Sequence, residues 1–424
     1  MREEVKFNVE NVLVTLLIVC MLSLRNFLYF GYFVQFCFLI IMLKKAFFIK
    51  KKLFFSRGFF LFFALLSCLW CESIKSYSAV LFSIIQIAII VFLLSQYIDN
   101  FSKVFKLIDS LVISSFVLVI NLLISTSIVE WKKIINYSSN KYVNVSSSGG
   151  RLGSTVGFHP NAFGSLIVIF SLCCYYKYLE TKQKRYLFLL GILFILLLLS
   201  KSRSSLFAFL IGFFVLKVLK EKKRFKKNLT FVFTFALLVI VMWAFINVPL
   251  LYKIVGYRLK GMFDIFNSYS SADASTTTRI DFIKIGFEIF LKNPLLGVGL
   301  NNYSFVAYNN YSIWGQVYAH NNYIELLADL GIIGFVFYYW IIIKCMKILY
   351  KTYKIVKFGN NEKIFKLASF LLTVSIVVLF IDFSQVTYYN ECFQIIEIII
   401  ICSGFLCSNF IERNYINEVR NQEN

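Results

Sequence analysis

The sequence contains few charged residues. Only 16% of its 424 residues are charged, whereas about a quarter of the residues are charged in a typical soluble domain. Hydrophobic residues make up 59%, and apolar runs of about 20 residues recur, which is the length that crosses a bilayer as a helix. This composition excludes a soluble domain and predicts an all-α polytopic membrane protein.

Acidic residues and histidines are scarce as well. There are 22 acidic against 44 basic residues, which gives a net charge of +22, and the chain has 2 histidines. In a soluble protein this excess would suggest nucleic acid as a partner. In a membrane protein, Lys and Arg gather in cytoplasmic loops, where they fix orientation and meet anionic lipid. We therefore expect membrane lipid, and no nucleic acid, as a partner.

Two further features are missing. No short apolar run with a cleavage site opens the chain, so no removable signal peptide is expected. Most of the 10 cysteines lie inside apolar runs, where a thiol behaves as a small hydrophobic group. They predict neither a zinc site nor a disulfide framework, and we expect neither a metal nor a cofactor. Cysteines of this kind include Cys20, Cys37, Cys68, Cys173 and Cys174.

The apolar runs predict about twelve transmembrane helices. Their approximate ranges are 9–24, 27–43, 53–71, 77–98, 104–128, 157–178, 186–200, 204–219, 229–248, 322–343, 367–385 and 391–411. Four basic segments are expected to be cytoplasmic, at 44–52, 182–185, 220–227 and 344–366. With a cytoplasmic N-terminus, alternating spans place all four there, together with the C-terminus. If 186–200 and 204–219 were one helix, this agreement would be lost.

The predicted topology leaves two long loops outside. These extracytoplasmic loops are 129–156 and, between the ninth and tenth helices, the larger 249–321. Residues 1–411 are expected to form a single membrane domain, and the polar residues 412–424 a disordered cytoplasmic tail. We therefore expect the chemistry to be carried by the larger loop and by the helix ends around it.

Three helices predicted to start on the outer side carry a His or an Arg at that start. These residues are His159, Arg203 and His320. A helix N-terminus offers free N–H groups and a positive end that suit phosphate, and Arg can bind phosphate with two hydrogen bonds. Each residue alone is explained as well by a position at the membrane interface. Three on one face favour a pyrophosphate site.

Arg279 is set apart by the helical projection of residues 277–292. Arg279 falls on the apolar side, next to Gly286, which is expected to leave room for it. An Arg in that position needs an anionic partner, which is either a ligand or an acidic residue of the protein. The charged residues of this helix share a narrow stripe on the other side: Asp281, Lys284, Glu288 and Lys292.

Polar residues also follow His320 into the next apolar helix. Asn322, Glu325 and Asp329 share one face of it. Intramembrane acids usually face a bundle interior or a cavity. We expect them to pair with the arginines of the outer side or to orient His320, in a supporting role. Asp382 is a weaker example of the same kind.

At these residues the sequence resembles the O-antigen ligase and polymerase family of bacterial envelope polysaccharide enzymes. Four blocks between about 150 and 335 carry the resemblance: 151–161, 199–206, 293–299 preceded by Arg279, and 320–334. The last two are specific in their order and spacing. One departure is Lys201-Ser202, where a small Gly-like residue commonly precedes the Arg.

The resemblance implies a multi-spanning, GT-C-like glycosyltransferase at the outer face of the bacterial cytoplasmic membrane. Such enzymes use a glycan on undecaprenyl pyrophosphate as donor. A polymerase joins repeat units to one another, whereas a ligase joins the finished chain to a lipid core. The family's functional positions correspond here to Arg279, His320 and Arg203.

The expected chemistry requires no metal. An acceptor hydroxyl attacks the anomeric carbon and the lipid pyrophosphate leaves, so Arg279 would stabilise the leaving group and His320 would act as base. No Asp-x-Asp nucleotide-sugar motif is evident, which favours a lipid-linked donor. The residues expected to bind the pyrophosphate are Arg203, Arg151, His159 and Asn161.

We favour a polymerase of capsule or O-antigen repeat units, because polymerases vary widely in sequence. A ligase is the alternative. A flippase or transporter would place polar residues near the midplane of many helices, whereas here they gather at one face. A flippase and a chain-length regulator are candidate partner proteins.

Overall fold

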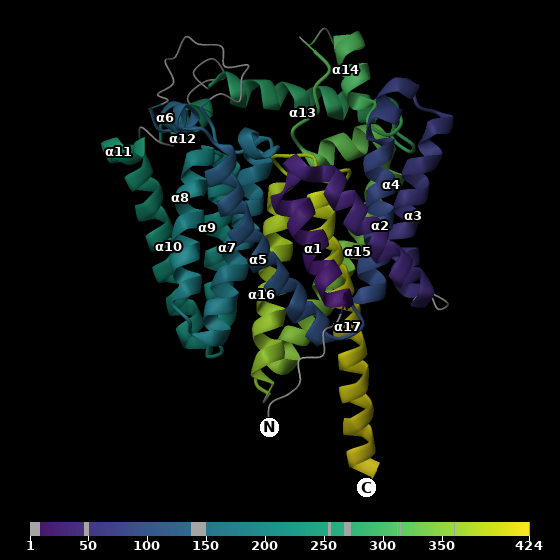
Figure 1. Cartoon of the computed structure of the whole chain (residues 1–424), viewed down its shortest axis with the longest axis vertical. Helices are drawn as coiled ribbons and strands as arrows, with labels where there is room; N and C mark the ends of the chain where they lie inside the picture. The colour runs from purple at the N-terminus through teal and green to yellow at the C-terminus, as the bar shows by residue number, and fades with distance from the viewer. Residues whose placement is uncertain are drawn as a thin grey trace.

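The computed structural model describes residues 9–45, 51–136, 150–252, 256–266, 273–311, 313, 315–359 and 361–423. All regular elements within these ranges are helices. In Figure 1 the long helices stand side by side, and α6, α12, α13 and α14 lie at one end of them, where α13 runs across the bundle. The predicted all-α class is confirmed, and we refer below to this end as the α13 end.

Each predicted span coincides with a long helix. Eight of these helices are long and apolar enough to cross a membrane; α1, α8 and the apolar part of α3 are shorter, and α9 has basic residues at both ends. The chain is therefore a multi-pass membrane protein. The helices are α1 (Val9–Ser23), α2 (Leu28–Lys45), α3 (Lys51–Leu66), α4 (Ile74–Tyr97), α5 (Phe101–Ser125), α7 (Pro160–Thr181), α8 (Arg185–Ser200), α9 (Arg203–Lys220), α10 (Arg224–Asn247), α15 (Asn322–Val356), α16 (Glu362–Ile381) and α17 (Glu391–Glu423).

The two predicted outer loops supply the short helices of the α13 end. The first loop contains α6 (Ile128–Asn136), and its residues 137–149 lie outside the described part of the chain. The second contains α11 (Pro249–Leu251), α12 (Tyr257–Phe263), α13 (Ala274–Lys292) and α14 (Tyr303–Tyr311). Both loops thus lie at one end of the bundle, as alternating spans require (Figure 1).

Basic segments meet at the opposite end. The Lys222 ammonium lies 5.0 Å from the ring centre of Phe365, and the Tyr353 hydroxyl donates to the Leu219 carbonyl at 3.0 Å. Segments 220–227 and 344–366 therefore pack together, away from α13 (Figure 1). Of the basic segment 44–52, residues 46–50 lie outside the described residues.

A tight turn separates α8 from α9. Lys201 has φ +52, and the Ser202 side chain caps α9 by accepting a hydrogen bond from the Ser205 N–H. The two short apolar runs are thus two helices, as the charge pattern requires.

The C-terminal residues differ from the prediction. A disordered tail was expected from Glu412, but α17 continues as a helix to Glu423 and extends beyond the bundle (Figure 1). The expectation was wrong because polarity alone does not end a helix: no Gly or Pro follows Gly404 to interrupt the backbone hydrogen bonds.

Candidate functional site

The starts of α7, α9 and α15 converge at the α13 end, and the connection between α16 and α17 joins them. The Asn161 carbonyl of α7 accepts hydrogen bonds from the Ser205 hydroxyl at 3.3 Å and from the Gln385 amide at 3.4 Å. In the same connection, the Asp382 carbonyl accepts the Asn322 N–H at 2.8 Å. The three helix starts that sequence analysis singled out are thus brought together.

Helix α15 is broken at Gly331, and a loop fills the break. Gly331 has φ +62 and ψ −169, which are not helical angles. Residues 294–299 pack there: Val298 N–H donates to the Ala328 carbonyl at 3.0 Å, and Gly299 N–H to the Asp329 carbonyl at 2.8 Å. The two most specific blocks of the sequence therefore interlock through their backbones.

The connection between α3 and α4 holds the other side of this loop. Leu300 N–H donates to the Ser67 hydroxyl at 3.0 Å, and the Trp70 indole donates to the Leu296 carbonyl at 3.1 Å. Ser73 N–H donates to the Asn302 side chain at 2.6 Å. The loop is thus held between α15 and residues 67–73.

The buried acids of α15 bind loop backbone. Asp329 accepts the N–H groups of Tyr303 at 2.6 Å and Asn301 at 3.0 Å. Glu325 accepts the N–H of Ala319, next to His320, at 2.6 Å. No ion pair joins either acid to an arginine among the described residues, contrary to one of the two roles we expected. Their contacts instead support the segments that lead to α14 and to His320.

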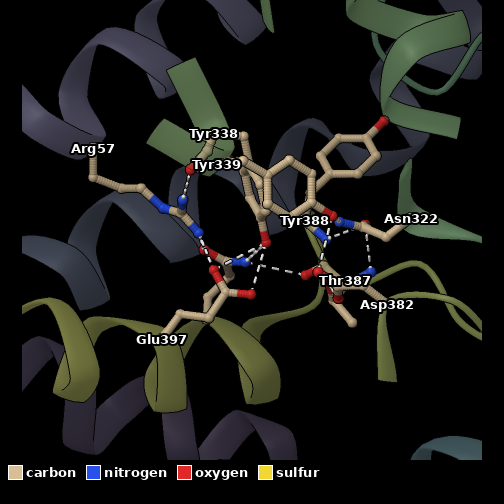
Figure 2. A network of polar contacts seen from close by, with 9 residues as sticks. Arg57, Asn322, Tyr338, Tyr339, Asp382, Thr387, Tyr388 and Glu397 are labelled. Atoms are coloured by element: carbon tan, nitrogen blue, oxygen red, sulfur yellow. Dashed lines mark hydrogen bonds and ion pairs between the residues drawn. The ribbon is translucent and has the colours of Figure 1, made fainter. Parts of the chain in front are cut away.

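Asn322 is fixed by a buried polar network, which Figure 2 shows from close by. Its side-chain oxygen accepts the Thr387 N–H at 2.8 Å, and its amide donates to the Tyr339 hydroxyl at 2.8 Å. The Asp382 carboxylate accepts the hydroxyls of Tyr339 at 2.9 Å and Thr387 at 2.6 Å. The start of α15 is therefore tied to the connection between α16 and α17.

The same network extends to an ion pair that sequence analysis missed. Arg57 of α3 pairs with Glu397 of α17, and both are 1% exposed. Gln394 accepts from Arg57 at 2.6 Å and donates to the Thr387 carbonyl at 3.2 Å, which joins the pair to the network (Figure 2). The sequence did offer a sign of this pair, because an Arg and a Glu lie inside two predicted transmembrane runs. We had expected the polar residues to gather at one face of the membrane domain. This buried pair shows that they are not confined to it.

Five basic side chains gather at the α13 end, and we call them the basic cluster: Arg151, Lys201, Arg203, Arg258 and Arg279. Arg151 donates to the Asn161 side chain at 2.7 Å and to the Ser200 carbonyl at 3.1 Å. Arg258, which sequence analysis did not single out, donates to the Lys201 carbonyl at 2.6 Å. These contacts join the first outer loop, the turn between α8 and α9, and α12.

Arg203 is occupied by protein partners. It is 9% exposed, forms an ion pair with Asp273 at 2.9 Å and donates to the Arg258 carbonyl at 2.8 Å. Asp273 also caps α13 by accepting the Thr276 N–H. Arg203 therefore fixes α12 and α13 against the start of α9.

Arg279 is half-buried on α13 and forms no hydrogen bond or ion pair with any residue that the structure describes. The polar stripe is otherwise as predicted, since Lys284, Glu288 and Lys292 are exposed. Gly286 has a different role from the one expected. A Cβ there would overlap Ile324, so this glycine lets α13 approach α15 and does not make room for Arg279.

The surroundings of Arg279 and Arg151 disfavour their positive charge. Burial and then the charge of Arg203 lower the pKa of Arg279 to about 10. Burial and then the charges of Arg258 and Arg279 lower the pKa of Arg151 to about 9. These shifts mean that the charged forms are destabilised by their surroundings. An anion bound between these side chains would relieve that cost.

His320 lies beside this cluster with φ +55. Its ring centre lies 4.1 Å from that of Tyr318 and 6.2 Å from that of Phe282. Its Nδ1 atom is buried and has no hydrogen-bond partner among the described residues. Burial, followed by the charge of Arg279, lowers the pKa of His320 to about 3, so the ring is neutral at pH 7 and can accept a proton.

His159 is exposed at the start of α7, where its Nδ1 accepts the Asn161 N–H at 3.3 Å. It thus caps this helix, as its position before Pro160 suggests. Of the expected phosphate ligands, His159 and Asn161 are used at least in part to build the start of α7.

Residues 187–339 match the family model described as O-antigen ligase. This part of the chain is therefore similar to the O-antigen ligase family. Members of this family are glycosyltransferase-like enzymes that act on lipid-linked glycans. The match includes Arg203, Arg279 and His320, whereas block 151–161 lies before it. A search among curated proteins found no match.

The backbone conformation also bears on the departure at Lys201. This residue has φ +52, in the left-handed region that a glycine adopts without steric cost. A small Gly-like residue before the Arg suits that backbone. In this chain the Lys201 side chain is buried and donates to the Ile134 carbonyl at 2.9 Å, a contact that a glycine could not form.

Proposed function

We propose that this protein transfers a glycan from undecaprenyl pyrophosphate to a hydroxyl of an acceptor glycan, without a metal, at the outer face of the bacterial cytoplasmic membrane. We further propose that it is a polymerase of capsule or O-antigen repeat units. One observation carries the proposal. Arg279, which forms no hydrogen bond or ion pair with the described residues, lies among other basic side chains and beside Nδ1 of His320, which has no hydrogen-bond partner among the same residues.

Arg279 would bind the pyrophosphate. The acceptor oxygen forms a bond to the anomeric carbon, the bond from that carbon to the phosphate oxygen breaks, and the electron pair remains on the pyrophosphate. Arg279 and Arg151 stabilise this charge, because a guanidinium binds phosphate with two charge-assisted hydrogen bonds. Arg203 contributes mainly by position, since Asp273 already occupies one of its nitrogens.

His320 would take the proton of the acceptor hydroxyl. Its pKa of about 3 reflects burial and the nearby charge of Arg279. A bound pyrophosphate brings negative charge that offsets Arg279, which raises the pKa of the imidazole towards its ordinary value of about 6.5. The base is therefore neutral before the donor binds and becomes stronger once the donor is present.

The remaining expected residues support these two. Asn161 orients Arg151 through their 2.7 Å hydrogen bond. Exposed His159, at the start of α7, would contact the lipid pyrophosphate. Asn322, Glu325 and Asp329 hold the backbone around His320 and are not proposed to react.

Polymerase and ligase share this donor chemistry and differ in the acceptor. The matched family is described as a ligase, so ligase remains the second candidate. Deletion of the gene followed by gel analysis of surface glycan separates the two. Loss of the ladder with one repeat retained indicates a polymerase. Long chains left on the lipid carrier indicate a ligase.

A flippase or transporter is less well supported. It would need polar groups in the membrane interior that can interact with a passing substrate. Arg57 and Glu397 do lie inside the bundle, but they pair with each other and with Gln394 and Tyr338. Purified protein in vesicles that elongates a lipid-linked repeat without moving it across the membrane would rule out this alternative.

A further inference from the structure

The connection between α3 and α4 contains a pair of cysteines that sequence analysis overlooked. Cys68 and Cys71 are three residues apart, at Cys-x-x-Cys spacing. Cys68 is exposed and Cys71 half-buried, whereas seven of the other cysteines are buried and Cys37 is half-buried. This is therefore the part of the chain where two thiols are both close together and accessible.

The local backbone places the two cysteines on one turn. Residues 67–69 form a 3₁₀ turn in which Trp70 N–H donates to the Ser67 carbonyl at 3.3 Å. The Cys71 thiol lies over this turn and donates to the Cys68 carbonyl at 3.5 Å. Residues three apart in a turn have Cα atoms within about 7 Å, which matches the separation that a disulfide requires.

A zinc site does not fit this place. A structural zinc needs four ligands, and a catalytic one needs three from the protein. The described residues contain no group of three or more His, Cys, Asp or Glu side chains placed to hold a metal ion. Two neighbouring thiols without further ligands are suited instead to form a bond with each other.

The cysteine pair adjoins the loop that fills the break in α15. A Cβ on Gly299 would overlap Cys71, so the loop backbone lies directly on this residue. The neighbouring residues Ser67, Trp70 and Ser73 all hydrogen-bond to the same loop. A covalent bond across the turn at 68–71 would therefore also stabilise the segment that holds residues 294–302 in place.

We propose that Cys68 and Cys71 form a disulfide that locks this support after the protein has entered the membrane. The proposal rests on the outward orientation of the α13 end, which is part of the proposed function, because disulfides persist in oxidising compartments. The oxidant is a disulfide of an extracytoplasmic thiol oxidoreductase. One cysteine thiolate attacks this disulfide, forms a mixed disulfide and frees one thiol of the oxidoreductase. The second cysteine thiolate then attacks the sulfur of the first, the bond to the oxidoreductase breaks, and the oxidoreductase leaves with two thiols.

The redox state can be measured directly on the full-length protein. Membranes are treated with excess N-ethylmaleimide without reductant, and the peptide with residues 68–71 is analysed by mass spectrometry. We expect an unlabelled peptide lighter by two hydrogens, which takes up two labels after reduction. Two labels without reduction would overturn the proposal. In Cys68→Ser, Cys71 should be labelled without reductant, which shows that the position is reachable.

A second measurement separates this proposal from the orientation on which it rests. Labelling of Pro294→Cys on a cysteine-free background with an impermeant maleimide reports the side of the α13 end. If position 294 is labelled from outside while the thiols of Cys68 and Cys71 are free, the proposed disulfide is wrong but the outward orientation stands. Inward position 294 would overturn the orientation as well.

The effect of the disulfide on the stability of the loop is measured separately, by thermal unfolding. Reduction should lower the unfolding temperature of the wild type in detergent and leave that of Cys68→Ser/Cys71→Ser unchanged. An equal shift in both proteins would mean that the bond does not stabilise the loop.

Discussion

Two side chains at the α13 end have polar atoms without a partner among the described residues: the half-buried Arg279, and His320 with its buried Nδ1. Buried polar atoms are almost always hydrogen-bonded, so each exception calls for an explanation. The guanidinium of Arg279 has no hydrogen bond or ion pair among the described residues, and Nδ1 of His320 is buried and unpaired. A ligand that carries both a negative charge and a hydroxyl group would supply a partner for Arg279 and one for His320.

Arg279→Ala should weaken binding of the undecaprenyl-pyrophosphate repeat unit by ~10–100-fold, because a hydrogen bond to a charged group contributes about 1.5–3 kcal/mol. Arg279→Lys should recover part of this, since it restores the charge without the planar fork. Binding and chain growth are measured on purified protein. Lys284→Ala, on the exposed stripe of the same helix, is the matched control. Undiminished binding in Arg279→Ala would remove Arg279 from the site.

His320→Ala should leave donor binding nearly intact and reduce turnover by ~10²–10⁴-fold, the usual share of general-base catalysis. If chain growth is complete without this imidazole, His159 becomes the next candidate for the base.

The pH dependence of the wild type follows from the sign of the pKa shift. A base acts when deprotonated, and the pKa of His320 in the empty site is about 3. Hence kcat/KM should be level from pH 5 to 8 and fall only as the pH drops towards 3. The decrease in kcat at low pH should begin at a higher pH than the decrease in kcat/KM, because bound pyrophosphate raises the pKa of His320. Activity that increases as the pH falls would instead mean that His320 acts as a cation.

Among the elements, the break in α15 and the loop that fills it determine the geometry around His320. Helix α15 leads away from His320 and stops being helical at Gly331, where the freed carbonyls of Ala328 and Asp329 accept the N–H groups of Val298 and Gly299. This pairing fixes how the second outer loop lies against the membrane helices.

Gly331→Ala should disrupt this arrangement. Gly331 has φ +62 and ψ −169, a region that is essentially restricted to glycine and costs another residue about 1–3 kcal/mol, and the added Cβ would overlap the Leu295 carbonyl. We expect a lower unfolding temperature and loss of chain growth. Gly191→Ala in α8 is the control, because nothing lies within 4 Å of a Cβ there. Equal stability of the two variants would mean that the break can close into a regular helix.

For the whole molecule, the polar network of Figure 2 connects the interior to the α13 end. It begins at the ion pair between Arg57 and Glu397, residues 340 positions apart in the chain, and reaches Asn322, next to the cap of α15. A buried pair of this kind stabilises little by itself, but removing one partner leaves an uncompensated charge.

Glu397→Met should therefore destabilise the protein by about 3–5 kcal/mol, whereas Arg57→Met/Glu397→Met should recover most of that loss. Thermal unfolding in detergent measures both. If the double variant is as unstable as the single one, the pair contributes through more than its charges.

The two ends of the bundle also predict the topology. Cysteines introduced at Pro294 should be labelled from outside, and those at Lys223 and Lys357 only after the membrane is permeabilised. The opposite pattern would reverse the orientation and, with it, the proposed function.

The sequence by itself determined the membrane class, the helix ranges, the separation of α8 from α9, and the positions of His159, Arg203 and His320 at helix starts. These features depend on apolar run length, helix-start residues and the charge of short segments, all of which are local. The projection of α13 is of the same kind, since it uses only the helical period.

Only the tertiary structure decided the partners. That Asp329 binds loop N–H groups, that Arg203 is occupied by Asp273, and that Arg57 finds Glu397 could not be derived from spacing. Each contact joins residues far apart in the chain, and a buried charge can be satisfied equally well by any suitable partner that packing brings near it. Local patterns therefore show which residues need a partner, and the packing of the helices determines which partner each one has.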